Sequence, residues 1–137
     1  MKPILLDTGV IVALIDRRER YHARCAALVE CLERPLVTCE AVIAESCYLL
    51  RALPRGVEAI LENIERGLVR IPFQLSQSAA PVRTLLKKYR DLPASLADAC
   101  LIHLADVFDT GDILTLDHDF ITYRWRRNHS FRLLLEL

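Results

Sequence analysis

The sequence predicts an α/β fold, in which a mainly parallel central sheet is flanked by helices, in one domain over residues 1–137. Short apolar runs alternate with longer segments that have helical periodicity. Because a helix between two strands returns the chain to the same edge of the sheet, this alternation favours parallel strands. A length of 137 residues suits one hydrophobic core, and a hydrophobic content of 53% argues against disorder.

Five apolar runs are expected to form the strands. The run before Asp7 is continuously apolar, and the run before Asp117 is apolar except for Thr115, which is typical of strands buried on both faces of a sheet. One short run follows Pro35, and another lies between Gly67 and Pro72, so turn residues bound both. In chain order, the expected strands cover residues 3–6, 36–38, 68–71, 113–116 and 131–135.

Six segments are expected to be helices, since their apolar residues recur at spacings of three and four. Pro35 and Pro54 lie beyond the ends of two of them, and Gly67 suits the C-cap of another. Ser95 is a suitable N-cap for the last helix, and Pro81 lies either inside the fifth helix or in its first turn. In chain order, the expected helices cover residues 10–15, 22–32, 40–50, 57–64, 76–89 and 95–105.

Composition excludes several classes of protein. No apolar run approaches the roughly 18–20 residues that cross a bilayer. Asp7 comes too early for a signal peptide, so we expect a soluble cytoplasmic protein. The five cysteines form no CxxC pair, which favours reduced core thiols over disulfides or zinc. Basic and acidic residues number 18 each, so net charge neither supports nor excludes nucleic-acid binding.

Four carboxylates occupy unusual positions. Asp7 and Asp117 each follow an expected strand directly, and the carboxyl ends of parallel strands form the edge where ligands bind. Glu45 and Asp98 lie on helical stripes that are otherwise apolar. An acid that faces the core is costly unless it is paired or bound to a metal, and no basic residue lies beside these acids in sequence.

Each of these acids also has a local explanation. Asp7 suits the cap of the following helix, and Asp98 suits the first turn of its helix, where the dipole favours negative charge. Glu45 fits the boundary of its stripe, and Asp117 fits an Asx turn. Four such positions in one chain nevertheless favour a shared site. Oxygen ligands alone suit Mg²⁺ or Mn²⁺, which can activate water for in-line displacement at a phosphate.

The sequence resembles the PIN-domain family at four motifs that span nearly the whole chain. Residues 6–14 resemble the opening motif, and Glu45 matches the second acid of the family, on the helix after the second strand. Residues 91–99 and 113–120 resemble the third and fourth motifs. The resemblance assigns catalysis and metal binding to Asp7, Glu45, Asp98 and Asp117, with auxiliary roles for Thr8, Thr115 and Asp119.

This resemblance implies a Rossmann-like PIN-domain sandwich, Mg²⁺ or Mn²⁺ as cofactor, and cleavage of single-stranded RNA. Such proteins are often homodimers. The closest branch in pattern is the VapC-like toxin branch of type II toxin–antitoxin systems, which implies a small antitoxin protein as partner. The main alternative is a PIN fold that acts as a catalytically silent binding or scaffold module, and the four retained acids argue against it.

Three other enzyme classes share part of the pattern. Residues 7–9, Asp-Thr-Gly, are similar to the catalytic triplet of retroviral-type aspartic proteases, but those proteins are almost all β. A haloacid-dehalogenase-like phosphatase needs a second aspartate where this chain has Gly9. A receiver domain needs a lysine after a late strand, and residues 114–119 contain none.

Two basic clusters follow the first and fourth motifs and are expected to flank the acidic site. There they would hold the phosphate backbone of RNA, while Tyr123 or Trp125 stacks on a base. The alternative is two solvated arginine runs, with Trp125 half in the core. The first cluster is Arg17, Arg18 and Arg20, and the second is Arg124, Arg126 and Arg127.

Overall fold

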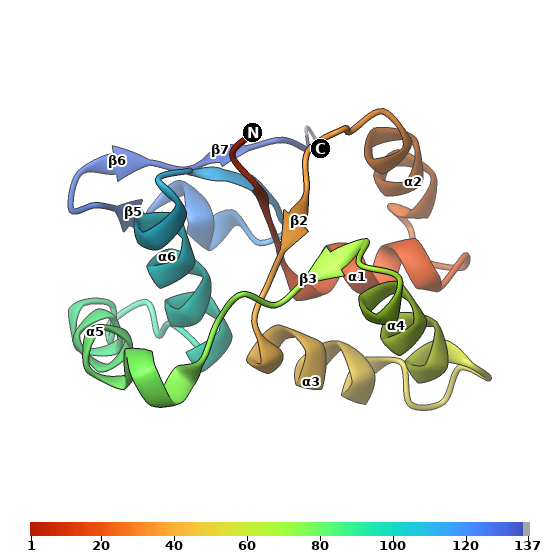
Figure 1. Cartoon of the computed structure of the whole chain (residues 1–137), viewed down its shortest axis with the longest axis horizontal. Coiled ribbons are helices and arrows are strands. Elements are labelled where there is room, and N and C mark those ends of the chain that lie inside the picture. The colour runs from red at the N-terminus through yellow and green to blue at the C-terminus, as the bar shows by residue number, and fades with distance from the viewer. Residues whose placement is uncertain (136–137) are drawn as a thin grey trace.

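The computed structural model describes residues 1–135, and within them five strands form one parallel sheet in the order β3-β2-β1-β4-β7 (Figure 1). The central strand β1 pairs with β2, where Ile4 lies opposite Leu36, and with β4, where Leu5 lies opposite Ile113. This topology confirms the predicted α/β class. The strands are β1 (Ile4–Leu6), β2 (Leu36–Val37), β3 (Val69–Arg70), β4 (Asp112–Leu114) and β7 (Arg132–Leu133).

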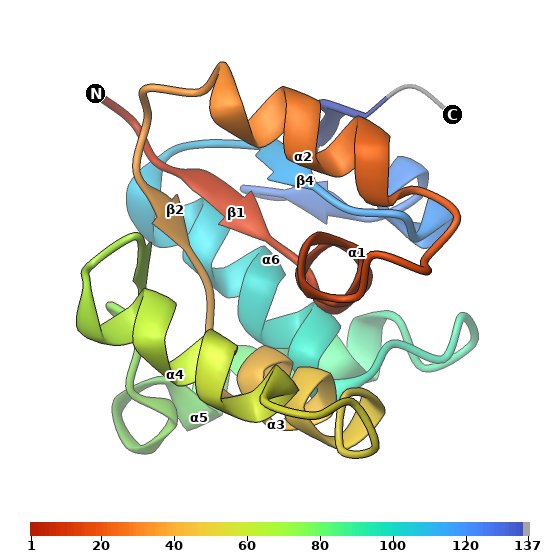
Figure 2. The same cartoon turned by 90° about the vertical axis from the view of Figure 1, so that its right-hand side faces the viewer.

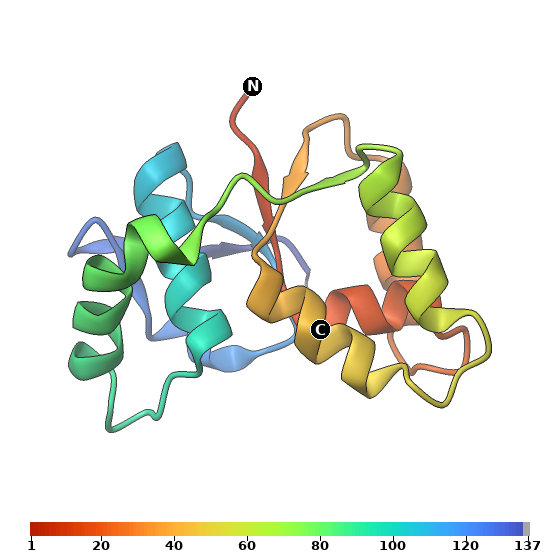
Figure 3. The same ribbon diagram turned by 60° about the horizontal axis from the view of Figure 1, so that its bottom comes forward.

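Helices cover both faces of the sheet. α5 and α6 pack together on one face, and α1, α2 and α4 lie on the other (Figure 1). α3 runs beneath the carboxyl ends of the strands and contacts both α1 and α6 (Figure 3). The helices are α1 (Thr8–Ile15), α2 (His22–Glu30), α3 (Glu40–Leu49), α4 (Gly56–Glu65), α5 (Leu75–Lys88) and α6 (Leu96–Phe108).

The core is centred on β1, β4 and α6. The side chains of β1 and of the apolar part of β4 are completely or almost completely buried. α6 lies between the sheet, α3 and α5, and eight of its thirteen residues are buried. A helix held on several sides positions its side chains firmly, including the acid in its first turn, Asp98.

The segment after β4 differs from the expectation. It forms a short 3-10 helix, η1 (His118–Ile121), and then an antiparallel hairpin of β5 (Arg124–Trp125) and β6 (His129–Ser130). The indole of Trp125 packs so closely against Gly111 that a Cβ atom on residue 111 would collide with the ring. The sequence indicated only a basic run here, because packing against a distant glycine produces no periodic pattern.

Three smaller expectations can be compared with the structure. Pro81 lies inside α5, where it is exposed, and not in the first turn. Cys25, Cys39 and Cys100 are buried as small core residues, and the five cysteines are free. None of the helices among residues 1–135 has the length and apolar character needed to cross a membrane.

Candidate metal centre

Asp7 lies between the last residue of β1 and the first residue of α1. Figure 2 shows that α1 begins at the carboxyl end of β1. It is the N-cap of α1, and its Oδ1 accepts a hydrogen bond from the Thr8 amide at 2.8 Å. Its Oδ2 accepts a second one from the Thr115 hydroxyl at 2.7 Å. The Asp7 carboxylate is therefore buried and oriented by donors from both β1–α1 and the end of β4.

Asp98 is held in the first turn of α6 by a capping box. The Ser95 hydroxyl accepts from the Asp98 amide at 3.0 Å, and Asp98 Oδ2 accepts from the Ser95 amide at 3.1 Å. The same Oδ2 accepts from the Tyr123 hydroxyl at 3.1 Å. The predicted N-cap at Ser95 and the predicted local role of Asp98 are both confirmed.

Asp117 follows β4 and caps η1. Its Oδ1 accepts from the Asp119 amide at 2.9 Å, which confirms the Asx-type turn, and its own amide donates to the Thr115 hydroxyl at 2.9 Å. Since Thr115 also donates to Asp7, one hydroxyl connects two of the acids. The Thr115 hydroxyl, for which the sequence predicted an auxiliary role, therefore links the Asp7 carboxylate to the backbone of Asp117.

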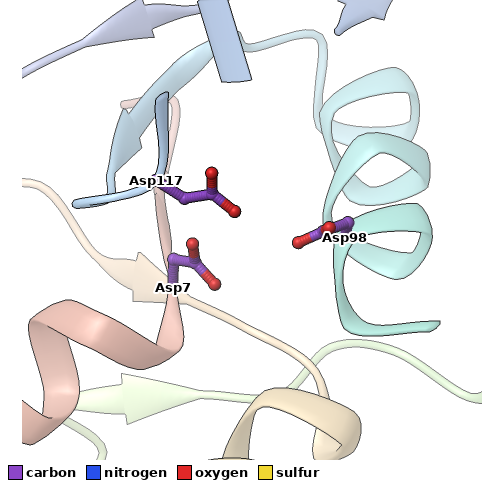
Figure 4. A group of neighbouring side chains, drawn as sticks. All are labelled: Asp7, Asp98 and Asp117. Carbon is purple, nitrogen blue, oxygen red and sulfur yellow. The ribbon is translucent and has the colours of Figure 1, made fainter. Parts of the chain in front are cut away.

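These three acids converge although they come from different parts of the chain. One carboxylate oxygen from each of Asp7, Asp98 and Asp117 lies within 4.8 Å of the other two. Figure 4 shows Asp98 on α6 directed across the gap toward Asp7 and Asp117. The cluster lies in a cleft of about 570 Å³, and no residue recorded along its wall within residues 1–135 is basic.

The position of Glu45 contradicts the interpretation of its helical stripe as core-facing. It does not lie on a core-facing stripe: it is exposed on α3, and the next residue, Ser46, is buried instead. The stripe pattern was misleading because α3 lies at the open edge of the sheet, where its apolar neighbours Tyr48 and Leu49 are also exposed. Glu45 still borders the cleft, and the Thr8 hydroxyl donates to its Oε2 at 3.2 Å.

Two further acids line the cleft. Asp119 was expected as an auxiliary residue and is half-buried there. Glu19 was not predicted, because it lies in the exposed turn after α1, in a polar stretch without periodicity. The cleft wall therefore carries negative charge from the mouth to the buried cluster.

Burial shapes the electrostatics of the cluster. It raises the pKa of Asp7 to about 6, against the opposing hydrogen bonds from Thr115 and Thr8. Burial also raises the pKa of Asp98, with hydrogen bonds from Ser95 and Tyr123 opposing it and the charge of Asp117 adding to it. A divalent cation would reverse this repulsion, and three carboxylates are the donors that hard cations prefer. The residues present thus fit a divalent metal.

One arginine of the second basic cluster, Arg126, lies elsewhere than expected. Arg126 donates to Asp109 at 2.7 Å, and Asp109 also pairs with Lys2, the residue two before β1. Lys2 precedes β1 whereas Asp7 follows it, so Arg126 lies at the amino edge of the sheet, opposite the acidic cluster. Its expected position beside the site is wrong, because the β5–β6 hairpin folds back along α6.

Tyr123 is also placed differently from the expectation. Its side chain is fully buried, so it cannot stack on a base, and its hydroxyl binds Asp98. Arg124 donates through Nη1 to the carbonyls of residues 121–123. Trp125 is half-buried against Gly111, as the alternative interpretation proposed, and Arg127 is exposed in the hairpin turn.

The first basic cluster lies in the turn after α1, the same turn that brings Glu19 to the cleft. Arg17 and Arg20 are exposed, and Arg18 pairs with Asp16 at 3.2 Å. This turn therefore reaches the cleft through Glu19, and the three arginines are not among the described residues that line it.

The parallel sheet and the acids at its carboxyl edge define an α/β protein with a cleft suited to a divalent cation. The profile of the PIN domain family matches residues 4–125, and the chain belongs to this family. It is 32% identical over 118 residues to Ribonuclease VapC26 of Mycobacterium tuberculosis, a match that covers 83% of this chain and 86% of that protein. The predicted resemblance to VapC-like PIN domains is thereby confirmed.

The fold has a close counterpart among solved structures. It superposes on the crystal structure of VapC20 of Mycobacterium tuberculosis, a toxin that cleaves the sarcin-ricin loop, with a TM-score of 0.77. The match covers 85% of this chain and 91% of that chain at 19% identity. At this identity the likeness concerns the fold, and it confirms the predicted PIN-domain sandwich.

Proposed function

We propose that this protein is a metal-dependent endoribonuclease that cleaves single-stranded RNA, and that it is the toxin of a toxin–antitoxin pair. The observation that carries the proposal is the convergence of Asp7, Asp98 and Asp117 without a basic partner on the cleft wall. A relative that covers most of the chain is a ribonuclease, and the similar solved structure is a toxin. The alternative of a silent scaffold does not explain why three repelling carboxylates are retained together.

Asp7, Asp98 and Asp117 would hold the cation, Mg²⁺ or Mn²⁺, and Glu45 borders the same cleft. When bound, the cation supplies positive charge that lowers the pKa of water and stabilises negative charge on the phosphate during in-line displacement. The chain supplies orientation: Thr115 fixes Asp7, and the capping box fixes Asp98. No histidine lines the cleft among the described residues, so acid–base work falls to carboxylates and water.

Glu45 and Thr8 form a pair at the mouth of the cleft. Thr8 holds Oε2 of Glu45, and none of the described residues donates to Oε1. We assign Oε1 of Glu45 the role of accepting a hydrogen bond from water or from a hydroxyl group of the RNA. Arg17 and Arg18, on the turn that borders the cleft, would bind the phosphate backbone outside it.

The toxin assignment implies two partners. One is a small antitoxin protein, and the other is a second copy of this chain in a homodimer. Coexpression with the product of the neighbouring open reading frame should relieve toxicity if that product is the antitoxin. Light scattering during size-exclusion chromatography measures whether the purified protein is a dimer.

The decisive experiment measures cleavage of a labelled single-stranded RNA by the purified protein. Cleavage should require Mn²⁺ or Mg²⁺, should stop with a chelator, and should be lost in Asp117→Asn. Asp109→Asn is the matched control, since it removes an equal charge at the opposite edge of the sheet. Cleavage that persists with the chelator would overturn the metal-dependent mechanism, and no cleavage with either metal would favour the scaffold alternative.

A further inference from the structure

Tyr123 places a phenol hydroxyl behind the acidic cluster. Its side chain is 0% exposed and packs edge-on against Tyr89 and Phe120, with ring centroids 4.9 and 5.0 Å away. Three aromatic rings in this arrangement hold the phenol in one orientation. The hydroxyl donates to Asp98 Oδ2 at 3.1 Å, so a rigid group outside α6 contacts an acid of the cluster.

The hydrogen bonds to Asp98 are unevenly distributed between its two oxygens. Oδ2 accepts from both the Ser95 amide and the Tyr123 hydroxyl, whereas no described residue donates to Oδ1. One oxygen is therefore used for orientation, and the other is left for a cation. The two donors come from different parts of the chain: Ser95 is the N-cap of α6, and Tyr123 follows η1, the short helix that Asp117 caps.

We propose that Tyr123 is a positioning residue of the metal centre, which holds Asp98 by Oδ2 so that Oδ1 faces Asp7 and Asp117. The proposal rests on the metal-dependent function proposed above. Without the phenol, the Ser95 amide is the one described donor left on Oδ2, and repulsion from the two neighbouring acids turns the carboxylate away from the cluster. Partners that orient a metal ligand in this manner commonly change metal affinity about 10- to 100-fold.

Tyr89 offers a matched control in the same aromatic group. Its ring packs against that of Tyr123, but its hydroxyl accepts from the backbone amide of Arg124 at 2.9 Å and does not touch an acid of the cluster. Tyr123→Phe and Tyr89→Phe each remove one buried hydroxyl and keep the ring. Tyr89→Phe loses hydrogen bonds to the amide and the carbonyl of Arg124, and only Tyr123→Phe loses a contact with Asp98.

The test is the binding of Mn²⁺ alone, measured without RNA by the electron paramagnetic resonance signal of free Mn²⁺. We expect Tyr123→Phe to bind Mn²⁺ about tenfold more weakly than the unchanged protein, and Tyr89→Phe to bind as the unchanged protein does. In RNA cleavage, the Mn²⁺ concentration for half-maximal rate should rise by the same factor in Tyr123→Phe. The rate at saturating Mn²⁺ should be nearly restored.

A double variant shows whether the effect passes through Asp98. In the Asp98→Asn background, Tyr123→Phe should cause no further loss of Mn²⁺ affinity. Unchanged affinity in Tyr123→Phe, or an equal loss in Tyr89→Phe, would overturn the positioning role and leave the proposed function intact. If the unchanged protein itself binds no Mn²⁺, the metal-dependent function fails and this proposal fails with it.

Discussion

The aspartates at the two edges of the sheet differ in whether they have basic partners. At the amino edge, Asp109 pairs with Lys2 at 3.0 Å and with Arg126 at 2.7 Å. Asp112, in the same region, pairs with Arg34 at 2.7 Å and also with Arg132. At the carboxyl edge, the partners recorded within residues 1–135 for the clustered acids are hydroxyls and amides, and none is a cation.

The pKa values follow this difference. The hydrogen bond from Lys2, together with the charge of Arg126, lowers the pKa of Asp109, whereas burial raises that of Asp7 to about 6. When an acid has a basic partner, the ion pair is a sufficient reason for its position in the fold. A buried acid without one costs stability, and the comparison shows that this cost is confined to the edge where parallel-sheet proteins bind ligands.

The largest expected difference between the edges is in activity. Asp7→Asn keeps the shape of the side chain and removes charge needed for the cation, so RNA cleavage should fall to background. We expect a loss of more than about 100-fold, since even the partners of metal ligands commonly contribute 10- to 100-fold. Asp109→Asn should cleave at the normal rate. Initial rates at saturating Mn²⁺ measure both, and an active Asp7→Asn protein would remove Asp7 from the site.

The next difference concerns pH in the absence of metal. The pKa of Asp7 is about 6 in the folded protein and about 3.8 unfolded, so the unfolded chain releases this proton first as pH rises. The contribution of Asp7 to the free energy of unfolding is therefore fully present below about pH 4. It falls by about 3 kcal/mol as pH rises through 6. The contribution of Asp109 to stability changes with pH in the opposite direction. Because its pKa is lowered in the folded protein, this contribution is lost as pH falls.

Urea unfolding of the metal-free protein between pH 4 and pH 7.5 measures this effect. The free energy of unfolding of Asp7→Asn, relative to the unchanged protein, should rise across this range. Asp109→Asn should show no such rise. A constant difference between Asp7→Asn and the unchanged protein at all pH values would contradict the raised pKa.

Metal binding should stabilise the protein by a similar amount. A cation that binds only the folded state adds about 2.7 kcal/mol at a concentration 100-fold above its dissociation constant. Mn²⁺ should therefore raise the melting temperature, and Asp98→Asn should remove most of the increase. Asp109→Asn should keep it. Melting curves with and without millimolar Mn²⁺ decide the matter, and an unresponsive protein would argue against a metal centre.

The smallest expected effect concerns the arginines, measured in the Asp7→Asn background to prevent cleavage. Arg126 is occupied at the amino edge, so Arg126→Ala should leave RNA affinity and its salt dependence unchanged. Arg17→Ala, on the turn that brings Glu19 to the cleft, should reduce the slope of log affinity against log salt by about one if Arg17 contacts one phosphate. If Arg126→Ala reduced the slope and Arg17→Ala did not, the RNA would bind along the β5–β6 hairpin and not along the turn after α1.

Much of the site was predictable because its acids follow local signals. Asp7 directly follows β1, Asp117 follows the apolar run that contains β4, and Asp98 lies three residues after a serine cap, so the sequence singled out all three acids that converge. The local explanations were also right, since Asp7 and Asp117 are caps and Asp98 belongs to a capping box. Capping and metal binding are not alternatives here, because a cap fixes a carboxylate at the end of an element, where a cluster can form.

What could not be predicted depends on contacts between distant residues. The stripe on α3 indicated a buried Glu45, but whether a stripe is covered depends on which element packs against it. Arg126 and Tyr123 were assigned to RNA because the hairpin that turns one toward Asp109 and buries the other has no periodic signal. Glu19 reaches the cleft through the turn after α1, which sequence identified only as polar.

The capping box on α6 has a consequence for how this protein can lose activity by mutation. Asp7 is the N-cap of α1, so Asp7→Asn, which keeps a capping oxygen and removes a buried charge, should leave a well-folded, inactive chain. Replacement of Asp98 by alanine also removes one half of the capping box, and losing a cap interaction costs a helix roughly 0.5–2 kcal/mol. In cells selected to survive expression of the active protein, inactive chains that still accumulate and bind partners should therefore carry asparagine at position 7 or 98 more often than alanine.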